Sequence, residues 1–164
     1  MNPEHPQIRV IGVGSPLMGD DGFGPRVIQE LQRRGDPEGV EAVDAGVGGL
    51  TLIGLLEGAD RVLLIDAARM GEPPGTLRVF PLKGGGAAQP AHLSLHEISL
   101  RPVLDFADAL GIRPEMVLLG VEPEVVAPGC GLSPAVEKAV PKAIELALEY
   151  VEAICGGAEW APEF

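Results

Sequence analysis

The first ordered unit of this chain lies in the stretch Ile8-Arg9-Val10-Ile11-Gly12-Val13-Gly14-Ser15-Pro16-Leu17-Met18-Gly19-Asp20-Asp21-Gly22-Phe23-Gly24. Residues 8–13 form a short β-branched run that ends among glycines, which is typical of a buried strand. From residue 22 to 34 apolar side chains recur at helical spacing, and Gly35 ends the pattern. A buried strand, a glycine-rich loop and a helix in this order predict the first unit of an α/β sheet.

Strands and helices alternate along the rest of the chain. The patterns predict strands over 40–45, 61–66 and 116–121, a helix over 50–57, a helix from Ser94 to Leu110, and a long helix after Ser133 and Pro134. The inward faces of the last two helices are expected to include Leu110 and Leu148, respectively. Residues 76–80 come ten residues after the third strand, too few for a helical crossover, so we expect an antiparallel, hairpin-like strand there.

These elements predict a three-layer α/β sandwich. Its sheet would have five strands, mostly parallel with one antiparallel strand, and helices on both faces. Residues 1–155 are expected to form one domain, because no linker or repeat interrupts them, and residues 156–164 to form a flexible C-terminal tail.

The composition limits the function classes. A chain of 164 residues with 46% hydrophobic and 22% charged residues is typical of one globular domain. The net charge of −12, with no basic cluster larger than Arg33-Arg34, argues against a nucleic-acid partner. We expect no membrane partner, because no apolar run reaches the roughly 18 residues of a membrane span. Cys130 and Cys155 match neither a redox pair nor a zinc site, which predicts a reduced, cytoplasmic protein.

The glycine-rich loop over residues 12–24 is the first candidate for a functional site. In open α/β sheets such sites lie beyond the carboxyl ends of the strands. A dinucleotide-binding loop would need a glycine at position 17, which is Leu17, and two carboxylates stand where a pyrophosphate would approach. A nucleotide site is therefore disfavoured. The ordinary interpretation is that Asp20 caps the following helix and that Asp21 complements its dipole.

Two further residues carry candidate chemistry. Asp66 follows the apolar run 62–65, so its carboxylate must be exposed, paired or bound to a ligand. His96 lies near the start of the third helical pattern, where a solvated first-turn histidine is the ordinary interpretation. If the strands ending at residues 13 and 66 are neighbours, Asp21, Asp66 and His96 emerge at one sheet edge, and this donor set suits a divalent metal such as nickel or zinc. From the residues alone, a metal site and a set of ordinary polar termini both stay open.

Several short motifs accompany this loop in a fixed order. They are Gly12-x-Gly-x-x-Leu-x-x-Asp-Asp-Gly-x-Gly24, Val43-Asp44-Ala45-Gly46, Leu64-Ile65-Asp66-Ala67, Pro74-Gly75-Thr76, Ser94-Leu95-His96, Leu119-Gly120-Val121-Glu122-Pro123 and Gly131-Leu132-Ser133-Pro134. The pattern resembles the hydrogenase maturation endopeptidases, which trim the C-terminus of the large subunit of nickel–iron hydrogenases. The resemblance spans most of the chain and implies a twisted five-stranded sheet. The family usually has Asn where this chain has Ser15, which changes the hydrogen bonding of the loop.

The resemblance also implies a site and a substrate. Asp21, Asp66 and His96 match family residues that bind metal and recognise nickel already installed in the hydrogenase precursor. Removal of the C-terminal extension would then follow nickel insertion. Nickel is expected to come with the large-subunit precursor, and zinc or cadmium to occupy the same site in its place. We expect the enzyme to be a monomer.

Two mechanisms follow from these residues. In one, nickel held by Asp21, Asp66 and His96 polarises the scissile carbonyl or a water, with Asp20 as the candidate acid for proton transfers. In the other, Asp21 and Asp66 act as a general acid and base, although the D-[ST]-G signature of aspartic peptidases is absent. Cys130 has no histidine nearby in sequence, which disfavours thiol catalysis. The alternative function is a non-catalytic metallochaperone or assembly factor that binds the nickel-loaded precursor.

Overall fold

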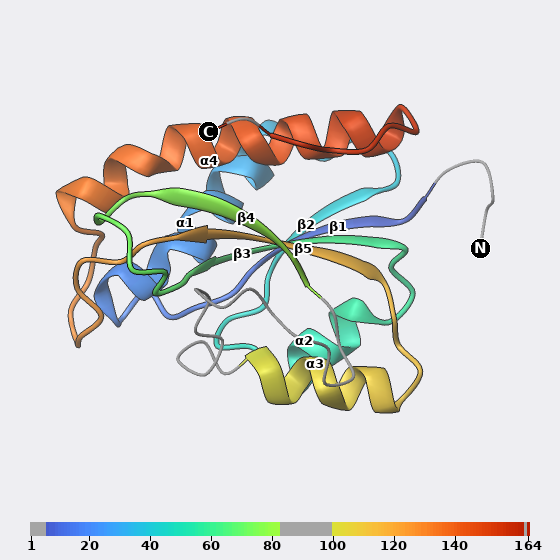
Figure 1. Ribbon diagram of the computed structural model, residues 1–164, viewed down its shortest axis with the longest axis horizontal. Helices are drawn as coiled ribbons and strands as arrows, with labels where there is room; N and C mark the ends of the chain where they lie inside the picture. Colours follow the sequence, from blue (N-terminus) through green and yellow to red (C-terminus); the bar gives the residue numbers. More distant parts are fainter. Residues whose placement is uncertain (1–5, 83–99, 163) are drawn as a thin grey trace.

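The structure is a computed structural model that describes residues 6–82, 100–162 and 164, and one five-stranded sheet lies at its centre (Figure 1). The strands are β1 (Ile8–Gly12), β2 (Val40–Asp44), β3 (Arg61–Ala67), β4 (Leu77–Leu82) and β5 (Glu115–Val121). Their order across the sheet is β2-β1-β3-β5-β4. All neighbours are parallel except β4 and β5, which confirms the expected mixed sheet.

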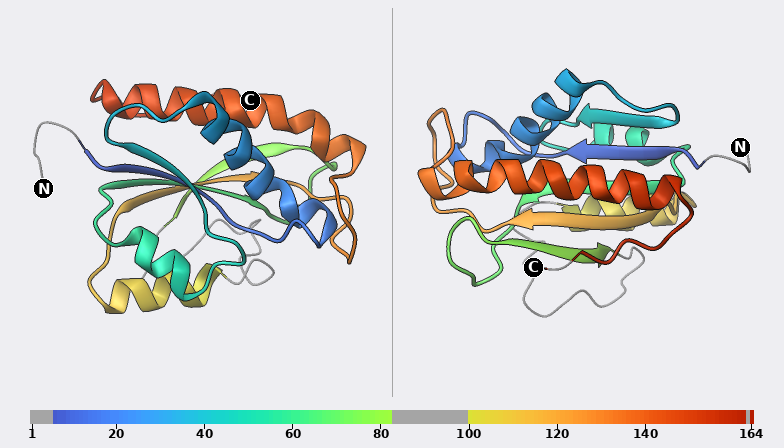
Figure 2. Two further views of the ribbon diagram at one scale, coloured as in Figure 1. Left: turned by 180° about the vertical axis from the view of Figure 1, so that it is seen from behind. Right: turned by 90° about the horizontal axis from the view of Figure 1, so that it is seen from above.

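Helices cover both faces of this sheet (Figure 2). On one face lie α1 (Phe23–Arg34) and α4 (Pro134–Cys155), and on the other lie α2 (Leu50–Leu56) and α3 (Leu100–Ala109). A short 3-10 turn, η1 (Gly19–Gly22), leads into α1. The arrangement confirms the three-layer sandwich. Ser94, the expected start of the third helix, lies outside the described residues.

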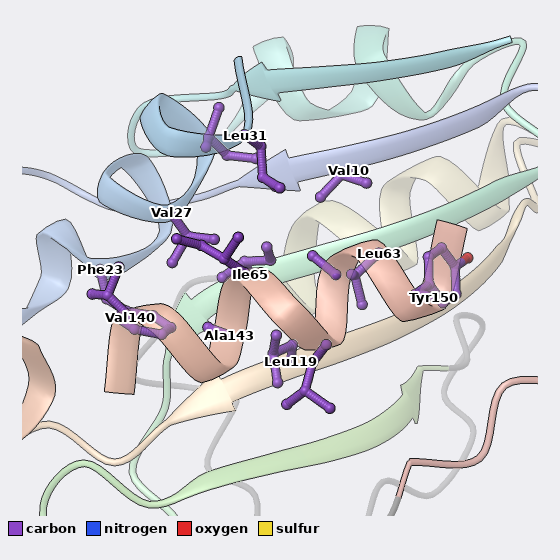
Figure 3. Close-up of a cluster of buried hydrophobic side chains, with 14 of the residues drawn as sticks. Val10, Phe23, Val27, Leu31, Leu63, Ile65, Leu119, Val140, Ala143 and Tyr150 are labelled. Carbon is purple, nitrogen blue, oxygen red and sulfur yellow. The ribbon is translucent and has the colours of Figure 1, made fainter. Parts of the chain in front are cut away.

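The sheet is buried on both faces, and successive residues of its central strands therefore alternate between two cores. Figure 3 shows Val27 of α1, Val140 of α4, and Leu63 and Ile65 of β3 gathered between the sheet and the α1/α4 pair. Leu64 instead belongs to the core under α2 and α3. This double burial explains why residues 62–65 form an uninterrupted apolar run.

Two residues expected to point inward are exposed. Leu110 lies one position past the end of α3 and is 56% exposed. Leu148 is 40% exposed, because the buried stripe of α4 passes through Ala147 and Val151 on either side of it. Both expectations are wrong at these positions, although α4 and the described part of the other predicted helix form as expected.

The antiparallel strand has a different partner from the expected one. The sequence suggested a hairpin between β4 and the strand before it, β3, but β4 pairs with β5, which is inserted between the two. The apolar β5 is buried in the interior of the sheet, whereas β4 contains Pro81 and lies at the edge. Proline lacks the N–H that a central strand needs for its second neighbour, so the edge is the position it tolerates.

The segment after α4 returns along the helix and the sheet edge (Figure 2). Trp160 packs against the larger core cluster, and its ring makes an edge-to-face contact with Tyr150, with centroids 5.2 Å apart and an interplanar angle of 81°. The side chain of Arg78 on β4 lies over the ring of Phe164 at 5.8 Å. Among the helices that the structure describes, none has the length and apolar character required to cross a membrane.

Candidate functional site

The loop between β1 and α1 is tied to the strands on both sides of β1. The N–H of Val13 donates to the carbonyl of Ile65 on β3 at 2.9 Å, and the N–H of Gly14 donates to the carbonyl of Gly46, after β2, at 2.7 Å. The hydrogen-bonding ladder of the sheet therefore continues into the loop. As a result, the loop lies over the carboxyl ends of β1 and β3, where parallel sheets place their sites.

Two glycines allow this loop to fold tightly. Gly14 has a φ of +136°, and a Cβ atom there would lie 1.9 Å from the carbonyl oxygen of Asp21. A Cβ atom on Gly24, at the start of α1, would lie 2.6 Å from the carbonyl oxygen of Val13. Both distances are too short for any side chain. The glycine spacing of the motif is thus needed to bring the turn that carries Asp21 against the end of the sheet.

Asp21 lies half-buried in η1. Its Oδ2 accepts a hydrogen bond from the backbone N–H of Ser15 at 2.8 Å. The hydroxyl of Ser15 accepts a bond of 3.3 Å from the N–H of Leu17. Serine therefore supplies a local side-chain hydrogen bond of its own, and the loop holds the carboxylate of Asp21 through the backbone.

Asp66 is the most unusual titratable residue of the described chain. It lies within β3, is 1% exposed, and neither of its carboxylate oxygens has a hydrogen-bond partner among the described residues. Burial raises the pKa of Asp66 well above its ordinary value, and the nearby negative charge of Asp21 raises it further. Buried polar groups are nearly always paired, so an unpaired buried carboxylate beside a second one indicates a functional site. Carboxylate oxygens are suitable ligands for a divalent cation, whose positive charge would offset the burial of the Asp66 carboxylate and its repulsion by Asp21.

Asp20 makes contacts that differ from those expected of a helix cap. It is fully buried, and its oxygens accept hydrogen bonds from the N–H groups of Glu124, Val125 and Ser133 and from the hydroxyl of Ser133. Burial alone would raise the pKa of Asp20, but these four bonds together lower it. A carboxylate held ionised in this way is a poor proton donor, which argues against Asp20 as the acid. The helix-cap expectation is wrong, because Gly22 is the N-cap of α1 and makes no side-chain cap.

The third expected ligand, His96, lies outside the described residues. In the part of the chain that the structure describes, no group of three His, Cys, Asp or Glu side chains is arranged to hold a metal. Asp21 and Asp66 are thus brought together as expected, and the metal site with His96 stays a prediction. Cys130 is a free, exposed thiol on the loop that contacts Asp20.

Two features near the site were not assigned from the sequence. Glu122 is buried after β5, and its Oε2 accepts a bond of 2.5 Å from the N–H of Met70, which fastens the segment after β3 to the end of β5. A hollow of about 550 Å³ also opens beside η1, lined by Pro16, Arg26 and Leu132 among others. The motif around Glu122 marked the position, but only the fold shows its contact.

Comparison with known proteins agrees with this architecture. Residues 25–150 match the family model of HycI, the hydrogenase maturation protease. The chain is 36% identical over 150 residues to the hydrogenase expression/formation protein HupD of Thiocapsa roseopersicina, covering 89% of this chain and 68% of that protein. It is 32% identical over 145 residues to the hydrogenase 2 maturation protease of Escherichia coli, covering 87% and 88%.

Solved structures give the same result. The hydrogenase maturating endopeptidase HybD from E. coli superposes with a TM-score of 0.75 at 30% identity, covering 89% of this chain and 92% of that one. The hydrogenase 2 maturation peptidase from Thaumarchaeota archaeon SCGC_AB-539-E09 superposes with a TM-score of 0.69 at 34% identity, covering 89% and 98%. An endopeptidase, rather than a non-catalytic assembly factor, is therefore confirmed. This chain belongs to the hydrogenase maturation protease family and is a hydrogenase maturation endopeptidase.

Proposed function

We propose that this endopeptidase removes the C-terminal extension from the large-subunit precursor of a nickel–iron hydrogenase after nickel insertion. The observation that carries the proposal is the pair of carboxylates at the end of β3, where Asp66 is buried without a hydrogen-bond partner among the described residues and lies near the charge of Asp21. Such a pair is costly to keep unless a cation or a proton compensates it.

The nickel of the precursor supplies that cation in this proposal. Asp21 and Asp66 would bind it from the protease side, and His96 is the proposed third ligand. Two oxygens and one nitrogen leave coordination positions open for the precursor's own ligands and for the scissile carbonyl or a water. Because the protease side of the site is incomplete without nickel, a precursor that lacks nickel would not be held in position for cleavage.

Hydrolysis then requires water to add to the scissile carbonyl, the C–N bond to break, and a proton to reach the leaving amine. In the nickel-assisted mechanism the metal polarises the carbonyl or the water. In the acid–base mechanism Asp66 carries the proton and Asp21 acts as the base, which the raised pKa of Asp66 supports. The two differ in one outcome: only the first requires bound metal for cleavage of a short peptide substrate.

The test is mass spectrometry of the cognate large subunit after incubation with the protease, with and without prior nickel loading. We expect loss of a C-terminal peptide from the loaded form only. Asp21→Ala, Asp66→Ala and His96→Ala should each abolish the mass change, while Glu149→Ala, an exposed change on α4, should leave it intact. An intact tail with the loaded precursor, or equal cleavage of both forms, would contradict the proposal.

Other divalent ions are part of this proposal. Zinc or cadmium would bind to the same ligands when nickel is absent, and elemental analysis of the isolated protein incubated with each ion tests this.

The protease would act as a monomer, because its proposed ligands all come from one chain. The free state of Cys130 and Cys155 supports action in the reducing cytoplasm.

A further inference from the structure

We infer that Asp20 is a positioning residue for the peptidase reaction, which clamps the loop after β5 onto η1 and thereby fixes Asp21. This inference rests on the proposed role of Asp21. The carboxylate of Asp20 joins segments more than 100 residues apart in sequence, and its neighbour in the same turn, Asp21, is the residue whose charge acts on Asp66.

Both oxygens of Asp20 take part in the clamp. Oδ2 accepts from the N–H of Glu124 at 2.8 Å, from the N–H of Val125 at 2.9 Å and from the hydroxyl of Ser133 at 2.9 Å. Oδ1 accepts from the N–H of Ser133 at 2.7 Å. Every partner donates, so only an acceptor at both oxygen positions satisfies the site. A carboxylate meets this requirement, whereas an amide would direct its NH₂ group at one or more N–H donors.

The backbones of the two segments are also joined directly. The N–H of Asp20 donates to the carbonyl of Val125 at 2.9 Å, and the N–H of Gly19 donates to the carbonyl of Gly129 at 3.0 Å. In return the N–H of Gly129 donates to the carbonyl of Leu17 at 2.9 Å. The loop after β5 and the loop before α1 therefore form one body at the carboxyl edge of the sheet.

The side chain of Ser133 contacts Asp20 rather than capping its own helix. It occupies the N-cap position of α4, where serine ordinarily accepts a hydrogen bond from the helix, yet it makes no side-chain cap. Its hydroxyl donates to Asp20 instead. The negative charge of Asp20 thus lies at the N-terminus of α4, which it also stabilises through the helix dipole.

The clamp matters for Asp21 because the two residues share one peptide bond. Asp20 accepts from the loop after β5, while Asp21 accepts from the N–H of Ser15 and its charge acts on Asp66. With Asp20 held at four points, η1 has little freedom to rotate, and the oxygens of Asp21 keep their place relative to β3. Loss of the clamp would release the turn without removing any group that touches the substrate.

The test compares two clamp variants with a variant that lowers stability elsewhere. Asp20→Asn keeps the size of the side chain and loses one acceptor, and Ser133→Ala loses the hydroxyl alone. Ser133→Thr keeps the hydroxyl and serves as the conservative rescue. Ile154→Ala, a buried site at the far end of α4, supplies a loss of stability without any contact to the clamp. All are assayed well below their Tm, with the folded fraction measured by circular dichroism.

We expect Asp20→Asn to lower kcat per folded molecule by about 10- to 100-fold with a small change in KM, as supporting partners of ligand residues do. Ser133→Ala should lower kcat less, and Ser133→Thr should restore it. The affinity for Cd²⁺ alone, measured by calorimetry, should fall in parallel in Asp20→Asn, while Ile154→Ala keeps wild-type kcat and Cd²⁺ affinity.

The inference would be overturned if folded Asp20→Asn kept the wild-type kcat and Cd²⁺ affinity. It would also be overturned if, at matched stability, Asp20→Asn and Ile154→Ala lost the same amount of kcat. If Asp20→Asn does not fold, equal kcat values for Ser133→Ala and Ser133→Thr overturn it. Full activity of Asp21→Ala would instead overturn the proposed role of Asp21, and the clamp's role with it. Activity lost in Asp21→Ala but kept in Asp20→Asn overturns the clamp alone.

Discussion

Gly24 lies so close to the end of β3 that a Cβ atom on it would stand 2.3 Å from the carbonyl oxygen of Ile65. Ile65 directly precedes Asp66, and Gly24 is the second residue of the helix that follows Asp21. The contact therefore sets the separation between the segments that carry the two carboxylates. Any side chain larger than hydrogen at residue 24 must push α1 away from the sheet.

We predict that Gly24→Ala lowers the free energy of unfolding by about 1–3 kcal/mol, because an added methyl group overpacks this contact. It should also lower peptidase activity, because the turn with Asp21 moves with the helix. Gly54→Ala is the matched control: residue 54 is exposed within α2, and a Cβ atom there meets nothing within 4 Å. That change should raise stability by about 0.5–1 kcal/mol. Equal stabilities of the two variants in urea titrations would contradict the explanation.

Asp66 should weaken the fold as pH rises. Its folded-state pKa lies above the ordinary value of 3.8, so the folded state binds a proton that the unfolded state has released. The contribution of Asp66 to stability is then fully present below pH 3.8 and declines by about 1.4 kcal/mol per pH unit until the folded pKa is reached. In buffer with a chelator, Asp66→Asn should remove this decline and exceed the wild type in stability at neutral pH, while losing activity.

The measurement is urea unfolding of the wild type and Asp66→Asn across a series of pH values. Glu149→Gln, at an exposed site, should follow the wild type throughout. A wild-type stability that rises in parallel with Asp66→Asn over this range would contradict the assignment of a raised pKa to Asp66.

The central sheet could be predicted from the sequence because its signals are local. The runs 61–66 and 116–121 each fall within one strand, and the run 8–13 extends one residue past the end of β1, which is marked by Gly12. The partner of β4 could not be predicted in the same way. Its pairing with β5 depends on a strand that comes more than 30 residues later, and Pro81 indicates an edge position for β4 without indicating which strand is its partner.

The candidate site, too, could be predicted from the sequence only in part. Asp21 and Asp66 were expected to meet because the ends of parallel neighbours lie at one edge, a consequence of topology alone. The role of Asp20 was not predictable, because its donors come from residues 124, 125 and 133. In sequence, an aspartate just before a helix resembles an N-cap. Only the fold shows that its carboxylate accepts hydrogen bonds from another segment of the chain.

Tyr150 should limit stability at alkaline pH. Burial raises the pKa of Tyr150 to about 12, against an ordinary value of 10.0, so the folded state retains the phenolic proton longer than the unfolded state. The contribution of Tyr150 to the free energy of unfolding should therefore be intact below pH 10 and fall by about 2–3 kcal/mol as pH rises to about 12. Tyr150 is the only tyrosine, so tyrosinate absorbance reports this group directly. In Tyr150→Phe, the part of the alkaline loss of stability that comes from Tyr150 should be absent. A midpoint of the tyrosinate absorbance near pH 10 in the folded protein would contradict the prediction.

Trp160 tests whether the segment after α4 is part of the folded domain. Its ring contacts Tyr150 edge to face, and its Nε1 is buried without a hydrogen-bond partner among the described residues. We predict that Trp160→Ala lowers the free energy of unfolding by about 1–3 kcal/mol through lost aromatic packing. Glu159→Ala, one residue earlier and exposed, should leave stability within about 0.5 kcal/mol of the wild type.

Trp160 is the only tryptophan, so the fluorescence of the protein reports on this residue alone. In the native protein its emission should be blue-shifted and shielded from acrylamide. A freely quenched tryptophan, with equal stabilities of the two variants, would show instead that residues 156–164 form the flexible tail expected from the sequence.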